Sequence, residues 1–565
     1  MNHPVIPIAV LDSTKQRKRQ APKGRRVDPA ELAQVQALLG TESRQRDLLI
    51  EHLHKIQDRF GCLSAGHLAA LAQEMHLAQT EVYEVATFYH HFDVVKEGQA
   101  APAALTVRVC DGLSCEMAGA RDLLARLPAL VGREVRVIAA PCIGRCEQAP
   151  AVAVGQHPIA NATVDTVATA VKSGTVKHDP AGFIDLAAYR AAGGYSLINE
   201  CVSGKRDVES VIKTLEDSGL RGLGGAGFPA GRKWRIVRAE AGPRLMAVNI
   251  DEGEPGTFKD RVMLERDPHR FLEGMLIAAW AVGIETIYVY LRDEYHGCRT
   301  MLEAELAKLR ANPPIQNMPT IHLRRGAGAY ICGEESAMIE SIEGKRGMPR
   351  LRPPYVAQVG LFGRPTLEHN FETLYWVREL LEKGGAWFAS FGANGRKGLR
   401  SFSVSGRVRS PGVKLAPAGI TIQALIDDHC GGMLSGHTFY GYLPGGASGG
   451  ILPAHMNNIP LDFDTLQPYG CFIGSAAVVV LSDQDTAVAA ARNTMRFFEH
   501  ESCGQCTPCR NGTAKAAELI AKRKWDLELL ADLSTVMRDA SICGLGQAAP
   551  NPIDCVVKYF PHELA

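Results

Sequence analysis

The sequence predicts a multidomain α/β protein with helical segments near both ends, and three observations carry this prediction. Its 565 residues are more than one hydrophobic core can organise, so three to five domains are expected. The spacing of apolar residues is helical near both ends and alternates or runs continuously, as in strands, between them. Two groups of cysteines lie on either side of a glycine-rich stretch, which indicates metal centres around a ligand-binding loop.

The composition is that of an ordinary soluble protein, and it excludes two classes of function. A formal net charge of +1 gives no whole-molecule argument for nucleic acid as a partner. No run approaches 18 apolar residues, so no membrane span is expected. Residues 1–27 include a basic stretch, KQRKRQAPKGRR, without the apolar segment of an export signal. We therefore expect a cytoplasmic protein with a flexible basic arm, or an arm that orders against a partner subunit.

Residues 28–99 are predicted to form a helical bundle. Asp28, followed by Pro29, has the form of a helix start, and Gly40 is placed to end that helix. An apolar stripe then recurs at helical spacing up to Gly61. Two more helices fit residues 64–75 and 80–92. The histidines of this segment, such as His90 and His91, are expected on the surface or in packing rather than as ligands.

Residues 100–175 are predicted to form a small α/β domain, because LTVRVC, REVRVIAA and PAVAVG are typical of short strands. Four cysteines follow these strands in the pairs CDGLSC and CIGRC, namely Cys110, Cys115, Cys142 and Cys146. The gaps of four and three residues are wider than the usual gaps of zinc pairs and favour a [2Fe-2S] cluster. Zinc and four incidental core cysteines are the alternatives.

Residues 176–400 are predicted to form a larger α/β domain with LMAVNI and TIYVYL as buried strands and a third strand beginning at IHLRR. Its segment RGLGGAGFPAGRKW, residues 221–234, has glycines that let backbone N–H groups approach a phosphate or a planar ring, beside three basic side chains. The order of glycines differs from the GxGxxG of dinucleotide folds. Glu334 and Glu335 begin a further helix, where acidic residues serve either the helix dipole or a ribose or amide ligand.

The last 165 residues divide into two predicted modules. Residues 401–480 suggest a compact β-grasp-like (ubiquitin-like) module with a structural or spacing role. Residues 481–565 are helical and contain CGQCTPC, whose three cysteines together with a distant fourth fit a [4Fe-4S] cluster better than zinc. These four residues are Cys503, Cys506, Cys509 and Cys543. The other cysteines are predicted to be isolated packing residues: 62, 201, 298, 332, 430, 471 and 555.

Five motifs together resemble those of one family: RGLGGAGFPAGRKW, NIDEGEPGTFKD, GAGAYICGEE, PRLRPPYVAQVGLFGRPT and ESCGQCTPCR. They are similar to the flavin-containing NADH-oxidising module of respiratory complex I, in an arrangement that fuses its thioredoxin-like [2Fe-2S] subunit to the front of its FMN subunit. The similarity covers residues 30–560. NAD-reducing hydrogenases have the same fused arrangement. The whole chain most resembles the β subunits of soluble bacterial NAD-linked formate dehydrogenases that use molybdenum or tungsten.

The resemblance implies a Rossmann-like domain that binds FMN and NAD, and it suggests a role for each matching position. The residues that match FMN contacts are Gly222, Gly224, Gly225, Lys233, Asn249, Asp251, Glu252, Gly333, Glu334, Asn370 and Thr373. Those that match nicotinamide nucleotide contacts are Phe228, Glu254, Glu335, Arg352 and Tyr355. Arg352 and Tyr355 replace Lys and Phe of the relatives, which keeps the charge and the ring.

Two positions depart from the family pattern. Leu223 stands where complex I subunits have Arg, and His369 replaces the first Asn of an Asn-Asn pair. A flavin contact through either position is therefore in doubt. Arg221, two residues before Leu223, is a candidate to compensate for the lost arginine.

The implied function is that of a diaphorase subunit, in which hydride passes between NAD and FMN without an obligatory catalytic side chain. Because the sequence shows no bis-pterin metal site, formate oxidation is expected in a large partner α subunit that supplies electrons for NAD⁺ reduction or receives them for CO₂ reduction. The enzymatic alternatives are the diaphorase subunit of a NAD-reducing hydrogenase and a complex I NADH-input module. The nonenzymatic alternative is an iron–sulfur scaffold that has lost its flavin.

Overall fold

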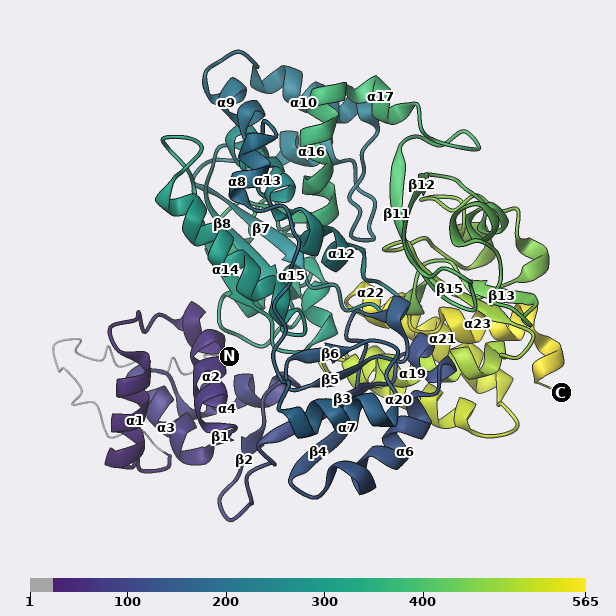
Figure 1. The fold of residues 1–565 in the computed structure, drawn as a ribbon, viewed down its shortest axis with the longest axis horizontal. Coiled ribbons are helices and arrows are strands. Elements are labelled where there is room, and N and C mark those ends of the chain that lie inside the picture. The colour runs from purple at the N-terminus through teal and green to yellow at the C-terminus, as the bar shows by residue number, and fades with distance from the viewer. Residues whose placement is uncertain (1–23, 565) are drawn as a thin grey trace, which may run out of the picture.

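A computed structural model describes residues 24–564 of the protein. The predicted basic arm at 1–27 therefore lies almost wholly outside the described residues. Five groups of elements follow one another along the chain, and Figure 1 shows the first helices beside the small domain and the last helices beside a mixed sheet. The central domain lies among them and contacts all of the others.

The N-terminal helical module is built from α1 (Pro29–Leu39), α2 (Leu49–Phe60), α3 (Ala65–Glu74) and α4 (Gln79–Phe88). The Asp28 carboxylate accepts a hydrogen bond from Ala30 N at 2.7 Å, which confirms the predicted helix start. Gly61 ends α2 in a left-handed conformation with φ 77°, also as predicted. The last helix is shorter than predicted, because it ends at Phe88 and the chain then becomes extended at Tyr89.

The small α/β domain has a four-stranded sheet in the order β4-β3-β5-β6. Its strands are β3 (Leu105–Cys110), β4 (Val135–Ala140), β5 (Val152–Val154) and β6 (His157–Ile159). The helices are α5 (Leu113–Met117), α6 (Ala120–Val131) and α7 (Val164–Ser173). All three strands predicted from the sequence are present. Both cysteine pairs lie at the ends of the parallel strands β3 and β4, so they meet at one edge of the sheet.

The central domain has a four-stranded parallel sheet in the order β10-β7-β8-β9. Its strands are β7 (Arg244–Ile250), β8 (Ile284–Leu291), β9 (Thr320–Arg325) and β10 (Thr366–Asn370). The first three were predicted from the sequence; β10 was not, because TLEHN carries polar residues and lacks a typical strand pattern. The position of β10 matters, because it brings Asn370 beside Asn249.

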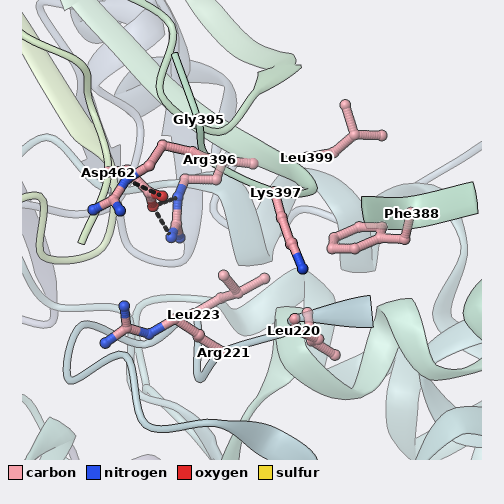
Figure 2. Close-up of a pocket in the computed structure, with 11 residues that line it drawn as sticks. Leu220, Arg221, Leu223, Phe388, Gly395, Arg396, Lys397, Leu399 and Asp462 are labelled. Carbon is pink, nitrogen blue, oxygen red and sulfur yellow. Dashed lines mark hydrogen bonds and ion pairs between the residues drawn. The ribbon is translucent and has the colours of Figure 1, made fainter. Parts of the chain in front are cut away.

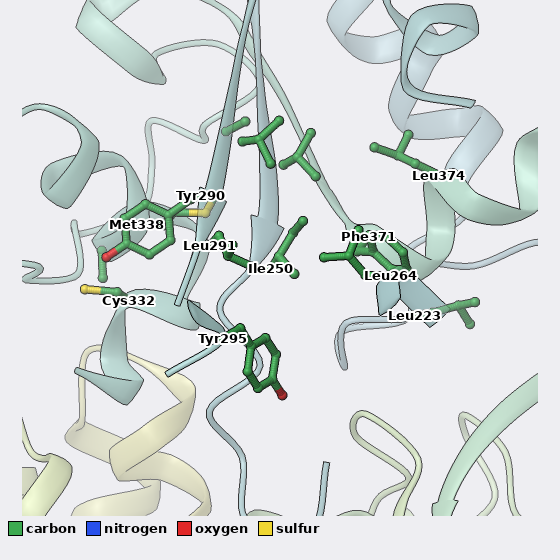
Figure 3. Close-up of a cluster of buried hydrophobic side chains, with 14 of the residues drawn as sticks. Leu223, Ile250, Leu264, Tyr290, Leu291, Tyr295, Cys332, Met338, Phe371 and Leu374 are labelled. Carbon is green, nitrogen blue, oxygen red and sulfur yellow. The ribbon is translucent and has the colours of Figure 1, made fainter. Parts of the chain in front are cut away.

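Helices on both sides of this sheet complete the central domain. They are α8 (Leu186–Ala191), α9 (Ser196–Val202), α10 (Val208–Ser218), α11 (Ala230–Ala239), α12 (Lys259–Arg266), α13 (Pro268–Val282), α14 (His296–Ala311), α15 (Glu335–Ile342), α16 (Phe371–Lys383) and α17 (Gly385–Ala389). Gly274 on α13 allows close contact with α16, since a Cβ there would lie 2.0 Å from Leu374 O. Figure 3 shows the buried side chains beneath the strand ends, among them Leu223, Ile250 and Phe371.

The fourth module has a mixed sheet in the order β12-β11-β15-β13-β14. Its strands are β11 (Leu399–Gly406), β12 (Gly412–Pro417), β13 (Phe439–Leu443), β14 (Leu452–Pro453) and β15 (Ala477–Ser482). The hairpin β11–β12 is antiparallel, and the last strand pairs in parallel with β11. A central parallel pair flanked by antiparallel strands is the β-grasp arrangement, as the sequence predicted.

The C-terminal bundle consists of α19 (Ala487–Glu501), α20 (Thr507–Ala521), α21 (Leu527–Ala540), α22 (Gly544–Ala548) and α23 (Asn551–Tyr559). Cys506 is the residue immediately before α20, and Cys543 is the residue immediately before α22. Within residues 24–564, no helix combines the length and apolar character needed to cross a membrane.

Candidate functional site

The predicted nucleotide-binding residues gather at the carboxyl ends of the central sheet. Asn249 to Glu254 lie at the end of β7, Gly333 to Glu335 follow β9, and Asn370 to Thr373 lie at the end of β10. Asn249 Nδ2 donates to Gly333 O at 2.8 Å, and Thr373 Oγ1 accepts from Leu223 N at 2.9 Å. Three segments and the glycine-rich loop therefore line one region, which is where open parallel α/β sheets bind nucleotides.

The glycine-rich loop is compact and packed closely against its neighbours. Gly222 N donates to Phe228 O at 2.8 Å, which closes the loop. A Cβ on Gly224 would lie 2.9 Å from Asn370 Cβ, and one on Gly227 would lie 2.6 Å from the Phe463 ring. Gly225 and Gly227 have φ of +131° and +66°, which side chains rarely adopt. The loop thus has the backbone freedom and the close approach that its sequence predicted.

Arg221 does not compensate for Leu223. Its guanidinium donates to Gly227 O and Asp464, both at 2.5 Å, and lies over the Phe463 ring at 4.6 Å. It thereby fastens the loop to the β-grasp module, and in Figure 2 it points away from Lys397. Figure 2 also shows that Leu223 and Lys397 line a polar cavity of about 220 Å³ behind the loop. The Leu223 side chain is buried and apolar, so it cannot replace the lost charge.

The β7 segment presents one carboxylate that has an unpaired oxygen and one that is fully bonded. Asp251 Oδ2 is buried without a hydrogen bond, and burial raises the Asp251 pKa well above its ordinary value. Glu252 instead accepts from Asp260 N at 2.8 Å, Arg261 N at 3.1 Å and the Tyr295 hydroxyl at 2.8 Å. Burial raises the Glu252 pKa to about 7. Asp251 is available to a polar ligand edge, whereas Glu252 organises the surrounding loops.

Glu254 lies between the central domain and the β-grasp module. Its carboxylate accepts from Ser448 N at 2.8 Å, from Ser448 Oγ at 2.7 Å and from the Tyr330 hydroxyl. Ser475 is within 2.7 Å of Thr257 in the same segment. Because we expected only a spacing role for the β-grasp module, Ser448 and Ser475 were missed. The signal that could have found them is the glycine-rich YLPGGASGG, which brings backbone close to Glu254.

The charged residues beside the loop pair with one another. Lys233 Nζ donates to the Glu368 carboxylate at 2.9 Å and to Glu368 O at 2.7 Å, and it lies 3.9 Å from Glu335. Although burial lowers the Lys233 pKa, the two carboxylates outweigh it and the net shift is upward. Glu334 caps α15 by accepting from Ala337 N at 2.9 Å. Glu334 therefore fulfils the helix-start alternative, and Lys233 serves protein carboxylates.

The residues expected to contact the nicotinamide nucleotide form the outer part of this region. Arg352 pairs with Glu334 and lies 3.1 Å from Glu335. Phe228 and Tyr355 have exposed rings, with 39% and 55% of their surface accessible. Exposed aromatic rings at the mouth of a polar cleft can stack on a nucleotide base.

His369 is directed away from any role like that of the asparagine it replaces. Its Nε2 accepts from the Trp234 indole N–H at 2.8 Å, and the ring is buried. Burial holds the His369 pKa well below its ordinary value, so the ring is neutral. Asn370, which keeps the family identity, caps α16 by accepting from Glu372 N at 3.0 Å and donates to Asp260 at 2.6 Å.

The first four cysteines converge in the small α/β domain. The Sγ atoms of Cys142 and Cys146 are 3.3 Å apart, and the Cys110 thiol interacts with both Cys115 and Cys142. Backbone donors approach the sulfurs, with Gly144 N 3.4 Å from Cys142 Sγ and Ala151 N 3.4 Å from Cys115 Sγ. Four buried sulfurs with N–H donors directed at them fit an iron–sulfur cluster.

Two buried arginines join this cysteine loop to the central domain. Arg292 donates to Cys142 O at 2.7 Å and also to Glu252 O. Arg261 donates to Gly144 O at 2.9 Å and pairs with Glu147. The loop packs so closely that a Cβ on Gly144 would lie 2.3 Å from the Tyr295 hydroxyl. One network therefore holds the cysteine loop and the β7 segment in a set relation.

The second group of cysteines surrounds the start of α20. The negative charges of Cys506 and Cys503 affect the Cys509 pKa, and Cys503 affects that of Cys543. Burial is the main cause that raises the Cys509 pKa to about 11 and the Cys543 pKa to about 12. Glu334 also affects the pKa of Cys503 and Cys543, so this group lies close to the nucleotide-binding region. The distant Cys543 thus joins the CxxCxxC motif, which fits a cubane cluster.

One prediction about the remaining cysteines is wrong. Cys471 and Cys555 are not isolated, because their Sγ atoms lie 3.6 Å apart in the buried contact between the β-grasp module and α23. Cysteines 84 positions apart in sequence give no local signal of this contact.

Three family matches together span most of the chain. Residues 35–174 match the thioredoxin-like [2Fe-2S] ferredoxin family. Residues 215–379 match the Nuo51 FMN-binding domain, and residues 489–565 match the NADH-ubiquinone oxidoreductase-F iron-sulfur binding region. These matches and the structure confirm the predicted fold class. The protein is of the class of FMN- and iron–sulfur-dependent NADH oxidoreductases, with domains for FMN, [2Fe-2S] and [4Fe-4S].

Individual relatives agree with the family matches. The F 2 protein of the NADH-quinone oxidoreductase of Rhizobium meliloti is 40% identical over 394 residues, which cover 67% of this chain and 93% of the relative. The mitochondrial 51 kDa subunit of NADH-ubiquinone oxidoreductase of Neurospora crassa is 38% identical over 374 residues, 63% of this chain and 76% of its own. The crystal structure of NAD⁺-reducing [NiFe]-hydrogenase in the H₂-reduced state aligns with a TM-score of 0.81, at 33% identity over 92% of each chain. The chain belongs to the family of the F-type, or 51 kDa, flavoproteins of NADH-quinone oxidoreductases.

The packing of the glycine-rich loop generates a first prediction. Gly227→Ala forces a left-handed residue to carry a Cβ that clashes with the Phe463 ring, so the loop shifts and FMN affinity falls about tenfold, on the order of 1.4 kcal/mol. FMN retained per chain, measured by fluorescence after extraction and dilution series, checks this outcome. The matched control is Gly182→Ala, which has the same left-handed strain at φ +77° but open space around it. Equal FMN affinity in the two variants contradicts the role of the loop.

Proposed function

We propose that this chain is the NADH:acceptor (diaphorase) subunit of a soluble formate dehydrogenase, and that it exchanges electrons with a large molybdenum- or tungsten-containing α subunit. One observation carries the diaphorase part of the proposal. The nucleotide-binding region lies between two groups of converging cysteines, since Arg292 bonds both Cys142 O and Glu252 O and Glu334 affects the Cys503 and Cys543 thiols. A flavin bound there is adjacent to both metal centres.

The proposed metal ligands are the two converging groups of cysteines. Cys110, Cys115, Cys142 and Cys146 hold the [2Fe-2S] cluster, and Cys503, Cys506, Cys509 and Cys543 hold the [4Fe-4S] cluster. Burial favours the neutral thiols, as the raised pKa of Cys509 and Cys543 shows. Cluster binding therefore displaces protons, and the N-terminus of α20 helps to stabilise the resulting thiolates.

The proposed FMN contacts are the closely packed parts of the site. Gly222, Gly224 and Gly225 let backbone approach the phosphate and ribityl chain, with Lys233 nearby as the cation. Asn249 and the unbonded Asp251 oxygen face the polar edge of the ring system, and Glu252 orders this segment through its three bonds. Gly333, Glu334, Asn370 and Thr373 complete the set. Lys233 must exchange part of its bonding with Glu368 for the phosphate.

The proposed NAD contacts lie at the exposed mouth of the site. Phe228 offers a ring for the adenine, and Tyr355 offers a second ring. Glu254 and Glu335 accept hydrogen bonds from hydroxyl or amide groups, and Arg352 holds Glu335 in place at 3.1 Å. FMN, when bound, supplies the chemistry that links hydride exchange with NAD to one-electron exchange with the clusters. The side chains position and exclude water; none of them is required as an acid or base.

The formate-specific part of the proposal rests on the resemblance of the whole chain to formate dehydrogenase β subunits. A second candidate, the diaphorase subunit of a NAD-reducing hydrogenase, is favoured by one specific observation: the hydrogenase crystal structure aligns over 92% of this chain. Both candidates require a large partner subunit in which the second substrate reacts. They differ in the metal of that partner, molybdenum or tungsten against nickel.

The proposed division of labour predicts how the isolated chain behaves. Purified alone and loaded with its cofactors, it should oxidise NADH with an artificial acceptor and show no formate-dependent reduction of NAD⁺. In a complex purified from its native source, elemental analysis should find molybdenum or tungsten. Formate oxidation by the isolated chain contradicts the partner requirement, and nickel in the complex decides for the hydrogenase candidate.

The cluster assignment predicts a selective loss. Cys506→Ser removes one of the ligands around α20, so the [4Fe-4S] EPR signal of the reduced protein should disappear while the [2Fe-2S] signal persists. Cys115→Ser is the matched variant and should give the reverse pattern. Loss of the two-iron signal in Cys506→Ser, with the cubane signal intact, overturns the assignment.

The nucleotide contact of Glu254 is tested by a substitution that keeps its shape. Glu254→Gln removes the charge that we propose accepts a nucleotide hydrogen bond, so the KM for NADH should rise about tenfold, or about 1.4 kcal/mol. Steady-state kinetics with an artificial acceptor measures the change. Glu285→Gln is the control, because Glu285 is exposed on β8 away from the strand ends. An unchanged KM in Glu254→Gln removes this residue from the site.

A further inference from the structure

Two histidines and a glutamate meet where the N-terminal helical module contacts the C-terminal bundle. His90 follows α4, and His500 and Glu501 are the last residues of α19. One ring nitrogen of each histidine and one carboxylate oxygen of Glu501 lie within 4.8 Å of one another. The sequence alone predicts His90 to be a surface or packing residue, since its partners are about 400 positions away.

The distances require only small movements to surround a metal ion. His500 Nδ1 is 3.2 Å and His90 Nδ1 is 4.0 Å from Glu501 Oε1, and the centroids of the two rings lie 4.1 Å apart. Ligands about 2.0–2.2 Å from a tetrahedral ion are separated by roughly 3.3 Å. The histidine side chains are 44% and 48% exposed, so they can rotate by this amount.

The glutamate is held in place, whereas the histidines are adjustable. Glu501 is buried, and its second oxygen accepts from Tyr330 N at 2.9 Å. A carboxylate anchored by a backbone donor, with its other oxygen toward two imidazoles, has the arrangement that orients ligands in metal sites. Burial lowers the His90 pKa, and this favours the neutral ring that binds metal ions.

The charges and the access around these residues are also suitable for a cation. Asp111 acts on His500 and Glu294 acts on His90, and both carboxylates favour positive charge there. The nearby Arg496 opposes it but is paired with Glu116 at 2.5 Å. His500 lines a cavity of about 420 Å³ between α19 and the loop of Cys142, which gives water and ions a path to the site.

A second cluster of similar composition is a weaker candidate. His54, His91 and Asp293 also lie within reach of one another, but they are almost fully buried. Arg325 donates to Asp293 at 2.5 Å, so the site already holds a positive charge. This arrangement is that of a buried ion pair, and it offers no path for a metal ion comparable with the cavity beside His500.

We propose that His90, His500 and Glu501 bind a divalent metal ion of the zinc class, with water as the fourth ligand. Two imidazoles and one carboxylate suit zinc, and an open position is usual where three protein ligands are present. The ion links the segment after α4 to the end of α19, two residues before Cys503. It therefore stabilises the contact between the N-terminal module and the segment that carries the second cysteine group.

The test measures zinc binding to the full chain, without a histidine tag and with FMN and both clusters loaded. After equilibrium dialysis against micromolar zinc, elemental analysis should find one zinc per chain more in the wild type than in His90→Ala or His500→Ala. His455→Ala, a variant of an exposed histidine elsewhere, should bind as the wild type does. Iron and FMN content, measured on the same samples, reports whether each variant is folded and excludes zinc at vacated cysteines.

A second measurement separates the site from unrelated zinc binding. Zinc should slow hydrogen exchange at residues 89–95 at least tenfold in the wild type and leave it unchanged in His500→Ala. Equal zinc content in the wild type and both histidine variants overturns the proposal. So does a wild type that binds zinc without slower exchange at 89–95, because the ion then lies elsewhere.

Discussion

The buried guanidinium of Arg292 is the contact on which the arrangement of the site depends. It donates to Cys142 O at 2.7 Å and to Glu252 O, and thereby joins the cysteine loop of the small domain to the segment after β7. Removing one partner of a buried charged network costs about 3–5 kcal/mol, because the charge left behind is not solvated. Arg261 and the Tyr295–Glu252 bond belong to the same network. The separation of the two functional regions is thus set by side chains with almost no freedom to move.

The β-grasp module has a comparable role on the other side of the glycine-rich loop. Asp464 and Phe463 hold Arg221, while Ser448 bonds Glu254, so one module contacts both the flavin-side loop and the nucleotide-side carboxylate. These contacts come from loops between its strands, and the sheet itself serves as their support. A module that looks like a spacer in the sequence therefore completes the site.

The sequence predicted the domain types, the strands of the small domain and both cysteine groups, because each depends on local patterns or on a shared motif. It did not predict contacts between residues distant along the chain. The strand β10 was missed because TLEHN is polar at several positions, and the Cys471–Cys555 contact because the two residues lie 84 positions apart. Arg221 was expected to replace the arginine lost at Leu223, but its direction depends on Asp464 and Phe463, and neither is near it in sequence.

The single chain that carries both the small domain and the central domain has a consequence for assembly. The relative from Rhizobium meliloti matches 67% of this chain and 93% of itself, so the domains of this chain beyond the match are not part of that relative's alignment. Where Arg261 and Arg292 join two domains of one polypeptide, their docking is intramolecular and proceeds at an effective concentration of roughly the millimolar range. Each flavin region is then matched by one cysteine loop of the small domain, and this stoichiometry does not vary with protein concentration.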